Sequence, residues 1–258
     1  MAVTGVGVDV GHGVPTGQTN AYLLGTDDAL LVDPGGRSQE LDRQVAERSV
    51  SHVAVTHHHP DHCAAVAHYA DVTDATVWAR RGREAAFRET AGIEPDRTFL
   101  GGESIPTDDG AIGVLDTPGH AAEHVSFCHP DGLVCGDLAI AEGSVAVAAP
   151  EGDLRSYLSS LRRVHAGAPS RLFPGHGPVV TDVRGTCRRL VSHRLTRERR
   201  VLAAVERGAQ TVSEVCDAAY EKDLTGVREM AEATVRAHLE KLAVEQRIEW
   251  DGHRAGPC

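Results

Sequence analysis

The sequence predicts a mixed α+β fold that is followed by a small helical domain. Two features of the sequence predict it. Residues 2–178 alternate short apolar runs with helical stretches, and several of the runs end in glycine or proline. From about Val179 onward the pattern is mainly helical and poor in glycine. We therefore expect two domains, one over residues 1–180 and a helical one over residues 181–258.

Several runs in the first domain are predicted to form strands. The run HVAVT at 52–56 is continuous and rich in β-branched residues, which is typical of a buried strand. The glycine-rich run at 5–13 lacks the strand–GxGxxG–helix context of a nucleotide-binding loop, so we interpret it as a strand and turn. The other strands are expected at 21–26, 29–35, 76–79, 112–117, 125–129, 132–137 and 171–178.

Two stretches of the first domain are predicted to be helices. Residues 62–70 have a helical composition. Residues 153–166 place three leucines and a valine at spacings of four, three and three, which puts these side chains on one face of a helix.

The second domain is expected to contain helices and a terminal hairpin. Residues 184–206 form one long helix or two. Thr211 and Glu214 make a capping box ahead of the next helix, and residues 230–246 form a further amphipathic helix. Residues 247–254 are interpreted as a strand and turn. Three helices with a hairpin indicate a winged-helix-like module.

The charge balance disfavours one class of function. The chain has 37 acidic and 26 basic residues and a net charge of −11, so non-specific nucleic-acid binding by the whole molecule is not favoured. Only two of the basic residues are lysines. An acidic chain with almost no lysine is typical of a halophile that keeps high salt in its cytoplasm. A GC-rich genome is the alternative explanation for the scarcity of lysine.

Neither a membrane span nor a secretion signal is expected. No apolar run approaches the roughly 18 residues that a membrane helix needs, and the N-terminus lacks the basic and apolar regions of a signal peptide. The six cysteines are scattered without a CxxC pair, so we expect no disulfide framework. The expected location is the cytoplasm.

The segment THHHPDH, which directly follows the run at 52–56, concentrates side chains that bind metals. Binding sites collect at the C-terminal ends of strands in α/β layers. His57 and His59 are two residues apart in an extended segment, so their rings point the same way and can share a metal. Asp61 and His62 open the next helix and face elsewhere. The spacing divides four ligands into two pairs, as two neighbouring metals require.

Three further motifs place ligand-type side chains after predicted strands. TPGH contains His120, CGD contains Asp137 and FPGHGP contains His176. Imidazole and carboxylate groups without thiolate suit zinc best, with iron, manganese or cobalt as alternatives. By strand alternation His58 points away from its two neighbours and is not expected to be a ligand. His124 lies four residues after His120, where it either faces the site or is filler, and filler is the favoured interpretation.

These motifs resemble those of the metallo-β-lactamase superfamily of hydrolases. The family's HxHxDH motif stands here as His57-x-His59-x-Asp61-His62, and TPGH, GD and PGHG follow in the same order. The resemblance covers about residues 1–180 and implies a four-layer αββα sandwich with the metals at one edge. One departure is the tripeptide CAA after the first motif, where family members commonly have paired glycines.

The resemblance also implies a role for each ligand. His57, His59 and His120 would hold the first metal, Asp61, His62 and His176 the second, and Asp137 would bridge the two. Asp33, in the VDPG that matches the family's first motif, would support the ligands through hydrogen bonds without binding metal. Asp61 would also orient the attacking water, which makes it the expected catalytic residue.

The expected function is a dinuclear zinc-dependent hydrolase, with two Zn²⁺ per chain, in which a metal-activated hydroxide attacks a small thioester or related ester. His59 stands where the superfamily's diiron flavoproteins carry glutamate, so an oxidoreductase is not expected. Two alternatives remain. One is a metal-dependent endoribonuclease or phosphodiesterase with RNA as partner. The other is a regulator whose winged helix binds DNA while the metal core senses a ligand.

The C-terminal segment bears on the choice of substrate. Residues 192–205 and the helices beyond resemble the tail of the β-lactamase-like protein 2 branch, which is of endoribonuclease type, whereas glyoxalase II relatives have a different helical tail. From Thr196 onward, however, ten basic residues face twelve acidic ones. Arg194 and Arg197, in an arginine-rich stretch, are candidates to bind a phosphate or carboxylate of the substrate. A solvated helix face, a lid and a homodimer contact are the alternatives.

Overall fold

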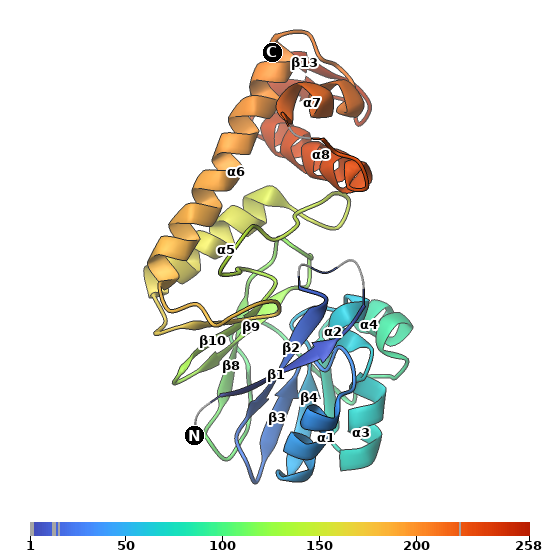
Figure 1. Cartoon of the computed structure of the whole chain (residues 1–258), viewed down its shortest axis with the longest axis vertical. Helices are drawn as coiled ribbons and strands as arrows, with labels where there is room; N and C mark the ends of the chain where they lie inside the picture. The colour runs from blue at the N-terminus through green and yellow to red at the C-terminus, as the bar shows by residue number, and fades with distance from the viewer. Residues whose placement is uncertain (1–2, 12–13, 15, 222) are drawn as a thin grey trace.

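The computed structural model describes residues 3–11, 14, 16–221 and 223–258. Two β-sheets pack face to face, helices cover both outer faces, and further helices rise from one end of this sandwich (Figure 1). The expected four-layer αββα arrangement is therefore confirmed. The predicted sandwich also places its metal-binding motifs where the chain leaves the sheets.

The first sheet has six strands in sequence order. They are β1 (Thr4–Asp9), β2 (Gln18–Leu24), β3 (Ala29–Val32), β4 (Val50–Ala54), β5 (Thr76–Arg80) and β6 (Arg97–Phe99). Pairing is antiparallel from β1 to β3 and parallel from β3 to β6. The glycine-rich stretch at 5–13 is mostly β1, as predicted, but residues 12 and 13 lie outside the described residues. Helices α1 (Gln39–Ala46), α3 (Val66–Thr73) and α4 (Glu84–Ala91) cover the outer face, and the short helix α2 (Pro60–Cys63) lies between β4 and α3 in the chain.

The second sheet has five strands in the order β11-β10-β9-β8-β7. They are β7 (Ser104–Ile105), β8 (Ile112–Asp116), β9 (Val125–His129), β10 (Gly132–Gly136) and β11 (Leu172–Pro174). Only the β10–β11 pair is parallel. Strands β8 and β10 both run antiparallel to β9 and therefore point in the same direction.

Strict alternation of side chains builds the core. In β3, Leu31 packs under the outer helices, while Leu30 and Val32 face the second sheet. In β10, Val134 joins the core between the sheets, and Cys135 packs on the other face. Because both faces of each sheet are covered, these strands are apolar at every position rather than at every second one.

The outer face of the second sheet is covered by two helices, α5 (Leu154–Gly167) and α6 (Val183–Glu206). Asp153 caps α5 by accepting a hydrogen bond from the backbone N–H of Ser156. Helix α6 is a single continuous helix. Its first half packs Cys187 and Leu190 against the sandwich, and its second half packs Val201 and Val205 into a separate apolar cluster. One helix thus joins the sandwich to the C-terminal segment (Figure 1).

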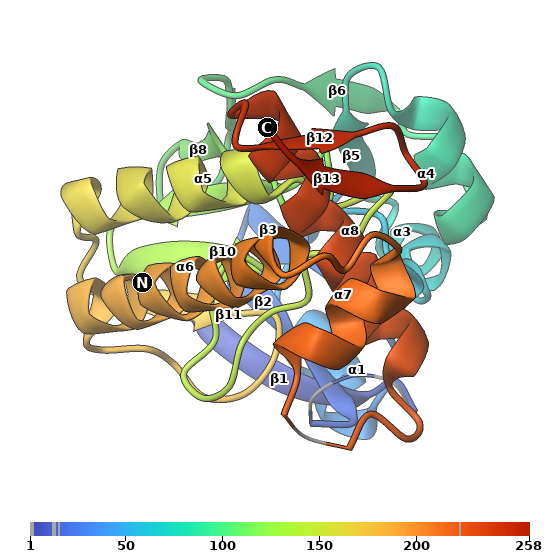
Figure 2. The same cartoon turned by 90° about the horizontal axis from the view of Figure 1, so that it is seen from above.

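The C-terminal segment completes the second apolar cluster. It contains α7 (Val212–Ala219), α8 (Arg228–Val244) and a hairpin of β12 (Ile248–Trp250) and β13 (Ala255–Pro257). The predicted capping box of Thr211 and Glu214 is present at the start of α7. Seen from above, α7, α8 and the hairpin surround the end of α6 (Figure 2). Among the described residues, no helix has the length and apolar character that a membrane crossing needs.

A buried ion cluster ties α6 to α8. The carboxylate of Glu198, which is 4% exposed, lies 2.7 Å from Lys241 Nζ and 3.2 Å from a guanidinium nitrogen of Arg247. Burial raises the pKa of the Glu198 carboxyl, but the interactions with His238 and Lys241 outweigh it and hold the pKa at about 2. The cluster therefore stabilises the fold only while this carboxyl is ionised.

Replacing Glu198 by glutamine is expected to lower the free energy of unfolding at pH 7 by about 3 kcal/mol. Because the folded-state pKa lies below the ordinary value of 4.5, this stabilisation is fully present above pH 4.5 and is lost as the pH falls toward 2. Urea unfolding of both proteins between pH 7 and 3 measures the difference. Glu245→Gln removes a more exposed partner of Lys241 and should cost less than about 1 kcal/mol. Equal losses in both variants would contradict the account.

Candidate metal centre

Five strands end at one edge of the sandwich, and each is followed by a predicted site residue. Strands β3 and β4 run parallel in one sheet, and β8, β10 and β11 share a direction in the other. The side chains that follow these strands are Asp33, the group His57, His59, Asp61 and His62, then His120, Asp137 and His176. The structure brings all of them together, in the place where α/β layers bind their ligands.

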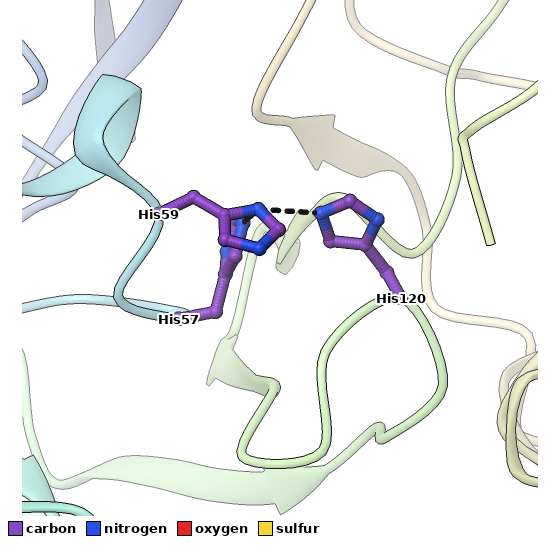
Figure 3. A group of neighbouring side chains, drawn as sticks. All are labelled: His57, His59 and His120. Atoms are coloured by element: carbon purple, nitrogen blue, oxygen red, sulfur yellow. Dashed lines mark hydrogen bonds between the residues drawn. The ribbon is translucent and has the colours of Figure 1, made fainter. Parts of the chain in front are cut away.

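Three imidazoles form a first cluster. His59 Nδ1 lies 3.0 Å from His57 Nε2 and 3.0 Å from His120 Nε2. Figure 3 shows His57 and His59 leaving one loop and His120 approaching from another, with the rings meeting at their edges. The three nitrogens lie within 4.8 Å of one another, which is compatible with one shared ion.

The outer nitrogens of two of these rings have acceptor partners. His120 Nδ1 lies 2.7 Å from the carbonyl oxygen of Ala146, and His59 Nε2 lies 3.1 Å from the carboxylate of Glu151. Carbonyl and carboxylate oxygens only accept, so both outer nitrogens must carry the proton. The inner nitrogens of both rings therefore present lone pairs to the cluster.

Asp33 sets the orientation of two further rings. Its carboxylate accepts hydrogen bonds from the Thr56 backbone N–H at 2.6 Å and from the Thr56 hydroxyl at 2.8 Å. Because that hydroxyl donates to Asp33, it accepts from His57 Nδ1 at 3.0 Å. The same carboxylate accepts from His62 Nδ1 at 3.0 Å. The Nε2 atoms of His57 and His62 therefore point into the site, an arrangement typical of histidines that bind metals.

The charge state of the first cluster suits a cation. Burial, followed by the positive character of neighbouring imidazoles, lowers the pKa of His57 well below its ordinary value, and burial is also the main cause that lowers the pKa of His120. Both rings are neutral near pH 7, so neither has a proton to share with His59. His57 Nε2 and His120 Nε2 each lie 3.0 Å from His59 Nδ1, so one ion among these nitrogens could bind all three.

A second cluster lies on the other side of His57. Asp61 Oδ2 is 3.5 Å from His62 Nε2 and 3.3 Å from His176 Nε2. His176 Nδ1 donates to the carbonyl oxygen of Gln18 at 2.8 Å, which again turns Nε2 inward. Burial lowers the pKa of His176, but the neighbouring carboxylates of Asp137 and Asp61 outweigh it and raise the pKa to about 10. A divalent cation can take the place of the proton that these carboxylates hold there.

The carboxylate of Asp137 faces both clusters. Its Oδ1 lies 3.7 Å from His62 Nε2 and 3.5 Å from His176 Nε2. Its Oδ2 lies 3.6 Å from His120 Nε2, in the first cluster. Both Asp137 Oδ1 and His62 Nε2 are buried without a hydrogen-bond partner. Unpartnered buried acceptors that face one another fit a site for metal ions.

Two neighbouring side chains stay outside the clusters. His58 turns away, as strand alternation predicts, and its Nδ1 pairs with the buried carboxylate of Glu123 at 2.9 Å. Burial raises the pKa of the Cys63 thiol well above its ordinary value, so this group stays protonated. Its sulfur lies 3.7 Å from the His57 carbonyl oxygen.

Comparisons with known proteins agree with this geometry. Residues 14–176 match the model of the metallo-β-lactamase superfamily. The chain belongs to that superfamily. The family prediction from the four motifs is therefore confirmed.

Two curated relatives and one solved structure show how far the similarity extends. A β-lactamase-like protein 2 homolog of Caenorhabditis elegans is 27% identical over 90% of this chain and 80% of its own length. An atrochrysone carboxyl ACP thioesterase of Aspergillus fumigatus is 27% identical over 80% of this chain and 66% of its own length. The structure of a metallo-β-lactamase family protein from Thermus thermophilus superposes with a TM-score of 0.79, at 24% identity, over 99% of this chain and 98% of its own.

Family membership and the thioesterase-named relatives identify the protein as a metal-dependent hydrolase. As in the superfamily's sandwich, its candidate metal centre lies at the edge where the sheets end. The coarse prediction of enzyme class is confirmed, whereas the number and identity of the metals belong to the proposal below.

The role of His124 in the site differs from the filler role expected from the sequence. This buried ring accepts a hydrogen bond from the Asp137 backbone N–H through Nε2, at 3.0 Å. Its Nδ1 therefore donates to Thr117 Oγ1, at 2.9 Å. Burial is the main cause that lowers the pKa of His124 to about 3, so the ring stays neutral and keeps this acceptor. His124 fixes the backbone from which the Asp137 carboxylate projects. The spacing of four from His120 was the only signal in the sequence.

Helix α6 holds the loop that supports the first cluster. The guanidinium of Arg189 donates to the carbonyl oxygens of Ile140 at 2.8 Å, Ala141 at 2.9 Å and Gly143 at 2.5 Å. Arg194 donates to the carbonyl of Val145, further along the loop. The following residue accepts the hydrogen bond from His120. The tail is thus connected to the orientation of a predicted ligand.

Replacing Gly175 by alanine is expected to disrupt the second cluster. A Cβ at this position would lie 2.6 Å from Asp137 Oδ1 and 2.7 Å from His62 Cε1, so the carboxylate must move. We expect roughly 100-fold slower hydrolysis and less bound metal, measured by turnover and by elemental analysis. Gly167→Ala is the matched control, because nothing lies within 4 Å of its added Cβ. A Gly175→Ala protein with full metal content and activity would contradict the packing described here.

Proposed function

We propose that the protein is a dinuclear zinc hydrolase that cleaves a small thioester or a related ester. The proposal assigns His57, His59 and His120 to the first metal, Asp61, His62 and His176 to the second, and Asp137 to both. The observation that carries it is the position of Asp137, whose two oxygens face two separate groups of inward nitrogens. A single ion would leave one of these groups without a partner.

The donor set supports zinc over softer or harder metals. Five imidazole nitrogens and two carboxylates, with no thiolate, suit zinc and leave iron and manganese as alternatives. Bound divalent metals lower the pKa of water and polarise a carbonyl oxygen, which are the two requirements of ester hydrolysis. Elemental analysis of the purified chain identifies the metal.

The carboxylate of Asp61 would orient the attacking water. Burial raises the pKa of Asp61, but its contacts with His176 and His62 outweigh this and leave the pKa below its ordinary value. Asp61 is therefore ionised near pH 7 and can accept a hydrogen bond from the attacking water. Water adds to the acyl carbon, the thiol leaves, and the water's second proton must pass to a base. Asp61 is the proposed acceptor of that proton.

The thioester substrate is supported by a relative's name. The Aspergillus fumigatus relative carries the name of an ACP thioesterase, and it is 27% identical to this chain over 80% of the chain. Cleavage of RNA or a phosphodiester is the alternative activity, and DNA binding by a winged-helix-like tail is the alternative without enzyme activity. The residues from Thr196 onward, ten basic and twelve acidic, support neither strongly.

A substrate panel tests the choice. The zinc-loaded protein is assayed on acyl thioesters, a phosphodiester and single-stranded RNA, and DNA retention is measured at several salt concentrations. We expect thioester turnover to exceed RNA cleavage, with no sequence-specific DNA binding. RNA cleavage with inert thioesters would overturn the proposed substrate and leave the metal centre intact.

We also propose a domain boundary near residue 180, a winged-helix-like C-terminal segment and a homodimer. The fold is compatible with each of them. Six free cysteines suit a cytoplasmic location. Salt adaptation would appear as an unfolding midpoint that rises between dilute buffer and molar KCl.

A further inference from the structure

A pocket of about 240 Å³ lies between helix α6, the segment from Tyr220 to Thr234, and the loop 144–146. This loop is shared with the metal centre, because the Ala146 carbonyl oxygen accepts the hydrogen bond from His120. The C-terminal helices that form the far wall stand above the sheet edge (Figure 1). The pocket and the metal centre are therefore on either side of one short loop.

The pocket contains positive charge without negative charge. Arg194 and Arg197 line it, and no acidic side chain does so among the described residues, although the chain has 37 acidic residues. Within the described part of the chain, neither arginine has a carboxylate at ion-pair distance. Arg194 instead donates to the Val145 carbonyl, and the Arg197 guanidinium lies 3.6 Å from the centre of the Tyr220 ring.

The positive charges of the two arginines also shift the pKa of a neighbouring histidine. Partial burial, and then the positive charges of Arg194 and Arg197, lower the pKa of His193 to about 4. The two guanidinium groups thus act on a third group that lines the pocket. A pocket with two arginines and no acidic side chain in its lining is a local site that attracts an anion, even in an acidic protein.

The rim of the pocket is apolar. Val227 and Met230 both line it, and they are 50% and 51% exposed. Large apolar side chains that face solvent beside two arginines suit a ligand with an anionic group on an organic body. A bare inorganic ion would leave that rim without a contact.

We infer that this pocket binds an oxyanion, a phosphate or carboxylate, carried by the substrate at a point remote from its scissile ester. Arg197 is the proposed principal contact, since its guanidinium carbon lies 3.6 Å from the centre of the Tyr220 ring and no carboxylate among the described residues pairs with it. A substrate of extended shape can occupy the pocket and the metal centre, because the two share the loop 144–146. The assignment of the oxyanion to the substrate rests on the proposed hydrolase function. The binding of an oxyanion in this pocket does not depend on that function.

Two thioesters that differ by one phosphate test the inference. The probes are an acyl thioester of pantetheine 4′-phosphate and the same thioester of pantetheine. In Arg197→Gln we expect the KM for the phosphorylated probe to rise about 10-fold, with kcat unchanged and the KM for the other probe unchanged. Arg197→Lys should retain part of the preference. Arg199→Gln changes an exposed arginine of the same helix that donates to Thr196 and does not line this pocket, and it should behave as wild type.

A second measurement separates the two sources of the oxyanion. Inorganic phosphate is expected to raise the Tm of the wild-type protein and of Arg199→Gln, but not of Arg197→Gln. This shift together with equal KM values for both probes would assign the pocket to a free oxyanion rather than to the substrate. If neither thioester is hydrolysed, the proposed function fails and the phosphate shift still decides the pocket. No phosphate shift, or an equal loss on both probes in Arg197→Gln, would overturn the inference.

Discussion

An Asp137→Ala protein is expected to lose hydrolytic activity by about 1,000-fold or more and to bind at most one metal ion per chain. The reason is geometric. The two oxygens of this carboxylate face separate clusters, at 3.5 Å from His176 Nε2 and 3.6 Å from His120 Nε2. Without these two oxygens, neither group of imidazoles has the carboxylate ligand that the two groups would share. Turnover and elemental analysis of the same preparation measure both effects.

Two further variants separate this effect from general damage. Asp137→Asn keeps the shape of the side chain and loses its charge, so it should fold normally and still lose most activity. Asp27→Ala removes an exposed carboxylate far from the metal centre and should leave metal content and turnover unchanged. Wild-type activity in Asp137→Ala would show that no bridge between the two clusters is needed.

Replacing Asp33 by alanine is expected to have the second-largest effect. It should lower both the free energy of unfolding and the affinity for metal. Asp33 is fully buried, and its carboxylate accepts hydrogen bonds from the Thr56 backbone, the Thr56 hydroxyl and His62 Nδ1. Loss of these acceptors leaves three buried donors unpaired. At about 1 kcal/mol or more each, we expect unfolding to become easier by at least about 3 kcal/mol. Metal affinity should fall about 10- to 100-fold.

Asp33 also carries a backbone constraint that the choice of variant must respect. Its φ of 53° lies in the left-handed region, which asparagine and aspartate tolerate better than alanine. Asp33→Asn keeps this tolerance and one carbonyl oxygen, so its losses should be intermediate. Urea unfolding and zinc titration measure them. If Asp33→Ala bound zinc as tightly as wild type, Asp33 would have no role in orienting His62.

The main strands were predictable from the sequence because the sheets are covered on both faces. The apolar run at 53–55 begins in strand β4 and is followed by a cluster of polar residues, and this pattern has few other interpretations. The helices α1 and α4 were not predicted, because each buries only two residues, such as Leu41 and Val45 in α1. Two apolar positions in eight are too few for a reliable helical period.

The sequence predicted either one helix or two over residues 184–206, where the structure has α6. Neither its apolar period nor its composition decides between them, because its two halves pack against different partners. Leu190 belongs to the sandwich cluster and Val201 to the C-terminal cluster. The low overall amphipathicity of the helix therefore reflects two separate apolar stripes along one continuous backbone.

The inner residues of the metal centre could be predicted, whereas most of their supports could not. Histidine and aspartate at strand ends are specific signals, because few other roles need them there. The partners of the outer nitrogens include the backbone carbonyls of Ala146 and Gln18. Every residue has a carbonyl group, so no sequence pattern marks these two. His124 was misjudged for a related reason, since its function is to hold a backbone N–H.

The metal content of the purified chain tests the central claim most directly. We predict two metal ions per wild-type chain, with zinc the expected element, and hydrolysis that stops when a chelator removes them and returns when Zn²⁺ is added back. The His57→Ala protein should hold less metal and show no turnover. Full hydrolysis by a chain that has been stripped of metal would contradict the account.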